Sequence, residues 1–125
     1  MSIFIIWVDR ENAKLFQFSQ LKMERSQVKA QYADHPAHQI DALDRTRSEK
    51  EFYNELASKM SEASQILIIG PGVARHHFQN HLLEHFPIVA KKVVGCENVD
   101  QPTDSQVALI AQRFFKLGTA KLGVV

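Results

Sequence analysis

One stretch of the chain decides the fold: Ile66-Leu67-Ile68-Ile69-Gly70-Pro71-Gly72-Val73-Ala74-Arg75-His76-His77-Phe78. A short, mostly β-branched run that is bounded by Gly and Pro is typical of a buried strand. From Phe78 onward, large apolar residues recur at every fourth position, at Leu82 and Phe86, which is the spacing of one helix face. The stretch therefore predicts a strand that passes through a two-glycine turn directly into a helix.

Three strand-like segments precede this corner. The apolar run at 3–8 and a second run at 14–18 flank the polar cluster 9–12, which is typical of a hairpin turn. A third strand is expected over 23–32, because apolar and polar residues alternate there. Residues 33–47 are expected to form a mobile loop, since Asp34-His35-Pro36 interrupts any strand and apolar residues are sparse.

Three helices and a fifth strand are expected in the remainder. The first helix is predicted to begin at Ser48 with a capping box to Glu51, and its apolar stripe is Phe52, Leu56, Met60 and Ala63. Pro87 is expected to end the helix that follows the corner, and residues 92–96 to form the fifth strand. A second capping box at Thr103 opens a last helix that ends near Gly118 and carries Val107, Ile110, Ala111 and Phe114 on one face.

This order predicts an α/β fold. The first three strands form an antiparallel meander, and the strand–helix–strand connections that follow are right-handed crossovers between parallel strands. The result is a mixed five-stranded sheet with helices on its faces, similar in order to the ribonuclease H-like layout. We expect residues 1–118 to form a single domain, and residues 119–125 a tail that is either frayed or an added edge strand.

The composition of the chain excludes a strong overall electrostatic attraction to nucleic acid or to an anionic membrane. Fifteen Lys and Arg residues against fourteen Asp and Glu residues give a net charge of +1, so any contact with nucleic acid must be local. The only cysteine, Cys96, lies in an apolar run and is expected to be a buried thiol in a reducing compartment. The run at 3–8 is too short for a signal peptide, and no window approaches the ~20 apolar residues of a membrane span. These features predict a cytoplasmic protein without a membrane contact.

Four short motifs carry a family resemblance: Trp7-Val8-Asp9, Gly70-Pro71-Gly72, Val94-Gly95-Cys96-Glu97 and Pro102-Thr103-Asp104. With them, the chain resembles the middle domain of the eukaryotic and archaeal class 1 peptide-chain release factors and of the ribosome-rescue protein Pelota, over about residues 3–116. It is more similar still to small single-domain bacterial relatives known as translational machinery proteins.

One departure from the release factors limits what the resemblance implies. In those factors the loop before the first long helix carries Gly-Gly-Gln, which helps water attack the peptidyl-tRNA ester. Here the loop reads Asp34-His35-Pro36-Ala37-His38-Gln39-Ile40-Asp41, with no adjacent glycines, and residues with a Cβ mimic that tip poorly. Pelota-type relatives also lack the motif. The resemblance therefore implies a non-catalytic, translation-associated domain that binds the ribosome or RNA.

The corner and its helix supply the expected binding residues. Free N–H groups at a helix start favour phosphate, so Gly70, Gly72 and Arg75 are candidates for an anion contact, although the glycines could serve only to allow a tight turn, and Pro71 removes one donor. The histidines are expected to face water and to gain charge below about pH 6.5, strengthening contact with an RNA backbone. They are His76, His77, His81 and His85 on the helix, with His35 and His38 in the loop.

Two other function classes stay open. His77 and His81 have the spacing of a shared metal site, but the Glu of a zinc-protease motif is missing, and no metal or cofactor is expected. A metal- or histidine-dependent hydrolase would use either carboxylates that include Asp9, which is more simply a turn residue, or His35 or His38 as general base. A structural homodimer would pair an exposed edge strand with its twin.

Overall fold

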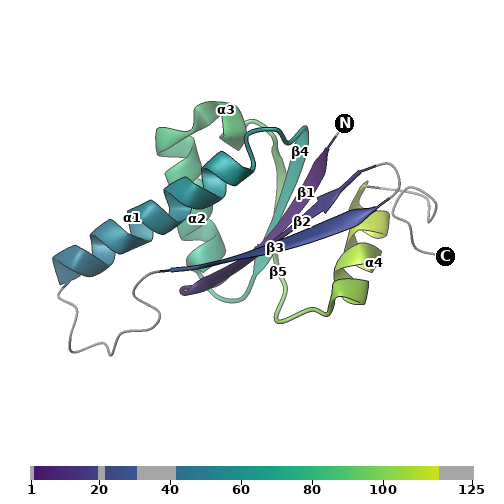
Figure 1. The fold of residues 1–125 in the computed structure, drawn as a ribbon, viewed down its shortest axis with the longest axis horizontal. Coiled ribbons are helices and arrows are strands. Elements are labelled where there is room, and N and C mark those ends of the chain that lie inside the picture. Colours follow the sequence, from purple (N-terminus) through teal and green to yellow (C-terminus); the bar gives the residue numbers. More distant parts are fainter. Residues whose placement is uncertain (1, 20–21, 31–41, 116–125) are drawn as a thin grey trace.

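The computed structural model describes residues 2–19, 22–30 and 42–115, and of residues 42–46 only the backbone. A twisted five-stranded sheet separates two groups of helices (Figure 1). The elements are β1 Ile3–Val8, β2 Asn12–Phe18, β3 Met23–Lys29, α1 Ala42–Lys59, β4 Gln65–Gly70, α2 Ala74–His85, α3 Pro87–Ala90, β5 Val93–Asn98 and α4 Asp104–Phe115.

The sheet has the strand order β3-β2-β1-β4-β5. The pairs β1–β2 and β2–β3 are antiparallel, whereas β1–β4 and β4–β5 are parallel. The predicted fold class is thereby confirmed: an antiparallel meander is followed by parallel crossovers. Because β1 and β4 are parallel neighbours, their carboxyl ends lie next to each other at the same end of the sheet, which matters for the site described below.

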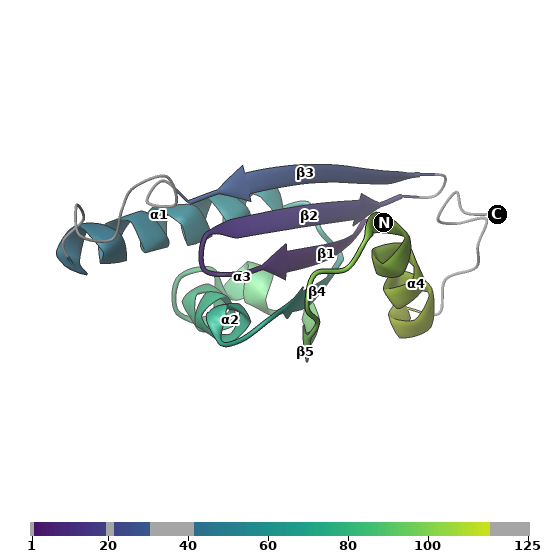
Figure 2. The same cartoon turned by 90° about the horizontal axis from the view of Figure 1, so that it is seen from below.

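Both faces of the central strands are buried, which explains their unbroken apolar sequences. Every residue of β1 is buried, and alternate residues contact different cores. Phe4, Ile6 and Val8 face the core that α1 and α2 cover, whereas Ile3, Ile5 and Trp7 face the core under α4. Figure 1 shows α1, α2 and α3 on one side of the sheet and α4 on the other, and Figure 2 gives the same arrangement from below.

The start of α1 differs from the sequence prediction. The helix begins at Ala42, so Ser48 lies inside it and the predicted capping box at Ser48 and Glu51 is wrong. The sequence of residues 42–47 carries no apolar stripe, but it contains Ala, Leu and two Arg residues, which are good helix formers. The expected loop therefore ends by residue 42, and residues 33–41 lie outside the described residues. The four residues of the predicted stripe are all buried, but only Phe52 and Leu56 lie on the helix, since α1 ends at Lys59 and Met60 and Ala63 follow it.

The other boundaries fall close to their predicted positions. Strand β3 ends at Lys29, and β5 extends to Asn98, two residues further than expected. Helix α2 ends at His85, before Pro87 as predicted, and Pro87 then takes the first position of the short helix α3, where its missing N–H interrupts no bond. Gly118 and the tail 119–125 lie outside the described residues.

The second capping box is confirmed. The amide of Thr103 donates to Gln106 Oε1 at 2.8 Å, and the amide of Gln106 donates to Thr103 Oγ1 at 3.2 Å. The predicted apolar face of α4 also packs on the sheet, with Val107 and Ala111 fully buried and Ile110 and Phe114 beside them. No helix in the described part of the chain is long and apolar enough to cross a membrane.

Candidate binding site at the β4–α2 corner

The two positions of the corner that carry glycine require it for different structural reasons. A Cβ on Gly70 would lie 2.1 Å from the carbonyl oxygen of Val8 in the neighbouring strand β1, so only glycine permits this close approach of the two backbones. Gly72 has open space around it but a φ of 62°, a conformation that residues with a Cβ rarely adopt. The glycines thus allow a tight turn between β4 and α2 and close packing against β1.

Arg75 lies in the first turn of α2 and folds back over the corner. Its Nη1 donates to the carbonyl oxygen of Gly72 and, at 3.4 Å, to that of Gly70. The guanidinium therefore stabilises the turn through hydrogen bonds to its backbone. The side chain of Arg75 is half-buried. A contact between Arg75 and an external anion has to compete with these two bonds, which sequence spacing could not reveal.

A cleft of about 540 Å³ lies beside the corner. Its walls are the β1–β2 turn, with Asp9, Arg10 and Glu11, and residues 71–74 of the β4–α2 turn. Val73 is 59% exposed at its edge, and as the N-cap of α2 it makes no side-chain capping bond. The cleft thus lies outside the carboxyl ends of two parallel strands, where open α/β sheets commonly bind ligands.

Asp9 is a turn residue in this cleft. Its Oδ1 accepts hydrogen bonds from the amides of Glu11 at 2.8 Å and Asn12 at 2.6 Å, which fixes the hairpin turn. The described residues contain no group of three or more His, Cys, Asp or Glu side chains that could hold a metal ion. The carboxylate arrangement that metal-dependent nucleic-acid cleavage requires is therefore not formed by this part of the chain.

The histidines of α2 divide into two kinds. His76 and His77 are exposed next to the corner, as the sequence predicts. His81 is half-buried and packs against α1: its Nε2 lies 2.8 Å from Asn54 Oδ1, and its ring centroid is 5.4 Å from that of Tyr53. The expectation that the helix histidines face water is therefore wrong for His81, because it lies on the flank of the core face that meets α1. His35 and His38 lie outside the described residues.

Two pKa shifts have clear causes. Burial lowers the pKa of His81, the neighbouring His85 and, to a smaller extent, Lys50 lower it further, and Glu84 acts in the opposite direction. Burial raises the pKa of the Cys96 thiol, and the nearby Arg75 opposes that effect in part. Cys96 is half-buried and packs against the core, so the predicted buried thiol is partly accessible.

Comparisons with known proteins place these features in a family context. Over 95 residues, or 74% of its length, the chain is 27% identical to a Pelota homologue of Methanocaldococcus jannaschii. Over 62 residues it is 34% identical to a Pelota homologue of Methanothermobacter thermautotrophicus. The fold matches crystal structures of Archaeoglobus fulgidus Pelota with a TM-score of 0.64 over 90% of the chain, and Thermoplasma acidophilum Pelota with 0.68 over 97%.

The chain resembles a Pelota or release-factor domain. An archaeal translation termination factor gives a TM-score of 0.66 over 98% of the chain at 17% identity, which supports the same fold. The likeness is to one part of these proteins, since the matches cover 26% and 18% of the two Pelota homologues and 31% and 36% of the two Pelota structures. No protein-family model matches the sequence. The predicted resemblance is thus confirmed for a Pelota domain by sequence and fold, and for a release-factor domain by fold.

Proposed function

We propose that this chain is a translation-associated domain that binds the ribosome or RNA and does not itself hydrolyse an ester. The observation that carries the proposal is the agreement of two comparisons: 27% identity to a Pelota homologue over 95 residues, and the Pelota fold over nearly the whole chain. Because the match covers only 26% of that homologue, the activity of a whole Pelota protein is not transferred with it.

The proposed contact surface is the β4–α2 corner with the adjoining histidines. The first N–H groups of α2 have no side-chain cap, and the positive end of a helix dipole attracts phosphate oxygens. His76 and His77 are exposed in the same first turns. Gly70 and Gly72 shape the surface, and Arg75 and His81 support it from within. His35 and His38, which lie outside the described residues, are proposed as further contacts on the strength of the sequence alone.

The loop sequence supports the absence of ester hydrolysis. Residues 34–41 contain no two adjacent glycines, so the Gly-Gly-Gln tip of the release factors cannot form from them. A domain with this fold and without that tip fits a role in binding, with the ribosome as partner.

Co-sedimentation with ribosomal subunits, followed by filter binding to ribosomal RNA at low and high salt, tests the proposal. We expect the full chain to pellet with one subunit, and the affinity to fall as salt rises, because each phosphate contact releases counterions. Replacing both His76 and His77 with Gln should weaken binding, because it removes two exposed imidazoles from the first turns of α2. His85→Gln, at the opposite end of α2, is the matched control and should leave binding unchanged.

Three results would contradict the proposal. They are the absence of co-sedimentation at low salt, an affinity that does not respond to salt, and equal loss of binding in the His85 control. Hydrolysis of peptidyl-tRNA by the purified chain would instead favour an enzyme, and would direct attention to His35 and His38 as general bases.

A further inference from the structure

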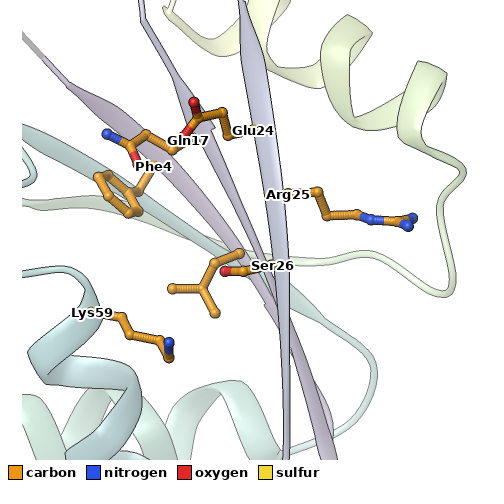
Figure 3. A pocket seen from close by; sticks show the side chains of 7 residues that line it. Phe4, Gln17, Glu24, Arg25, Ser26 and Lys59 are labelled. Atoms are coloured by element: carbon orange, nitrogen blue, oxygen red, sulfur yellow. The ribbon is translucent and has the colours of Figure 1, made fainter.

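A polar hollow lies on the α1 side of the sheet, near the start of β1 and therefore far from the corner at its end. Its volume is about 190 Å³. Six of the lining residues come from three neighbouring strands and one from the end of α1: Phe4, Leu15, Gln17, Glu24, Arg25, Ser26 and Lys59 (Figure 3).

The hollow forms because the paired residues of β2 and β3 on the α1 face of the sheet change from apolar to polar along the strands. The β2–β3 register pairs Ala13 with Val28, then Leu15 with Ser26, and then Gln17 with Glu24. These pairs share the face that α1 covers, where the alternation of a strand would ordinarily place core side chains. Helix α1 ends at Lys59, so the polar pairs lie beyond its cover.

Three of the lining side chains have unused hydrogen-bonding groups. Within the described residues, no side-chain hydrogen bond or ion pair forms at Gln17, Ser26 or Lys59. Glu24 contacts Lys22 at 2.8 Å, but both side chains are more than half exposed, so this pair contributes little. Arg25 points away from the hollow toward α4 (Figure 3), where its Nη1 lies 3.2 Å from both carboxylate oxygens of Asp104.

The arrangement of charge suggests the ligand. In Figure 3, Gln17 and Glu24 lie at one end of the hollow and Ser26 and Lys59 at the other. The side chains of Phe4 and Leu15, which are buried in the core, form an apolar floor. A ligand that satisfies both ends therefore carries an ammonium and a carboxylate that are separated by a short hydrocarbon stem.

We propose that this hollow binds a short linear zwitterion of the ω-amino acid type. The ligand's carboxylate accepts hydrogen bonds from the Lys59 ammonium and the Ser26 hydroxyl, and its ammonium donates to the Glu24 carboxylate and the Gln17 amide oxygen. A hollow of 190 Å³ has room for about six water molecules, which suits a molecule of that size.

Titration of the full chain, followed by amide NMR shifts, tests the ligand class. The probes are the series from 3-aminopropanoate to 6-aminohexanoate, each with an analogue acetylated on nitrogen and an analogue amidated at the carboxylate. We expect saturable shifts at Gln17, Glu24 and Ser26 with an optimum stem length, and binding about tenfold weaker for either single-charge analogue. Equal binding of the zwitterion and its analogues, or the absence of saturable shifts, would overturn the proposal.

Variants test the assigned contacts. Lys59→Met should lower the affinity for the best probe by about tenfold. Glu24→Gln should make the zwitterion and its acetylated analogue bind with equal affinity. Lys50→Met is the matched control: it makes the same chemical change on the exposed surface of the same helix, outside the hollow. The proposal fails if Lys50→Met reduces affinity as much as Lys59→Met does. Circular dichroism of each variant establishes that the fold is kept.

Discussion

At the scale of single residues, the corner shows how one atom can determine which residue a position accepts. Gly70 and Gly72 look alike in sequence, two positions apart in one turn. The first lies against the backbone of β1, whereas the second faces open space. Their substitution by alanine should therefore have different consequences.

Gly70→Ala should destabilise the fold by about 3 kcal/mol, because the new Cβ would lie 2.1 Å from the carbonyl oxygen of Val8 and the central strands must separate. Gly72→Ala is the matched substitution, and should lower the free energy of unfolding by about 1 kcal/mol through its left-handed backbone alone. Urea denaturation of the two variants measures the difference. Equal losses would show that the approach of β4 to β1 is not the constraint.

Cys96 should react slowly in the folded chain. Burial raises the pKa of its thiol above the ordinary value of 9.0, so less of the reactive thiolate is present at pH 8 than in an unfolded chain. The rate of alkylation by iodoacetamide, measured with and without urea, checks this expectation. A folded protein that reacts as fast as the unfolded one would contradict it.

At the scale of elements, a histidine takes part in the contact between α1 and α2. The ring of His81 is bonded to Asn54 on α1 and lies 4.7 Å from the ring of His85, centroid to centroid. Sequence periodicity identifies Phe78 and Leu82 as core residues of α2 but does not show which flank meets α1. That information exists only once the crossover has placed the two helices side by side.

Stability should fall as the pH drops below about 6.5. Burial lowers the pKa of His81 in the folded state beneath the ordinary value of 6.5, so the unfolded chain binds this proton more readily. The stability that the neutral His81 side chain contributes is therefore complete above pH 6.5, and it is lost as the pH falls through the pKa of His81 in the folded state. Urea unfolding from pH 8 to pH 5 should show a shallower pH dependence of stability for His81→Gln than for the parent, and an equal dependence in the two would contradict this assignment.

The start of α4 offers a second test at this scale. Thr103→Ala removes the side chain that accepts a bond from the amide of Gln106, and should lower stability by about 1 kcal/mol. Ser105→Ala, a change on the exposed surface of the same first turn, should stay within about 0.5 kcal/mol of the parent. Thermal or urea unfolding of both variants measures the effect, and equal stabilities would remove the capping box as a determinant of α4.

The two predicted capping boxes explain what sequence can and cannot establish. Ser48 and Glu51 have the right spacing, but the helix continues to Ala42 because nothing in the polar segment before Ser48 breaks it. Thr103 follows Pro102, which disfavours a helical conformation of the residue before it, so the second box coincides with a real helix start. At the candidate site, the corner was predictable from local spacing, whereas the bonds of Arg75 and His81 depend on tertiary contacts.

At the scale of the whole molecule, local unfolding of the sheet should begin at its edge strands, β3 and β5. β1 and β4 are buried on both faces and paired on both edges, whereas β3 and β5 end the sheet, β3 being largely exposed and β5 partly so. Amide hydrogen exchange should therefore be slowest at Ile5, Ile6 and Ile68 and much faster in β3. Protection that is as strong in β3 as in β1 would point to a partner strand along that border and thus to the homodimer alternative.

Trp7 gives the molecule a reporter on one of its two cores. It is the only tryptophan of the chain, its side chain is 3% exposed, and its Nε1 donates to the carbonyl oxygen of Asp100 at 2.7 Å, just before α4. Its fluorescence will move to longer wavelength when α4 leaves the sheet, yet will stay constant while only α1 shifts. Emission spectra can therefore time events on one side of the protein independently of the other.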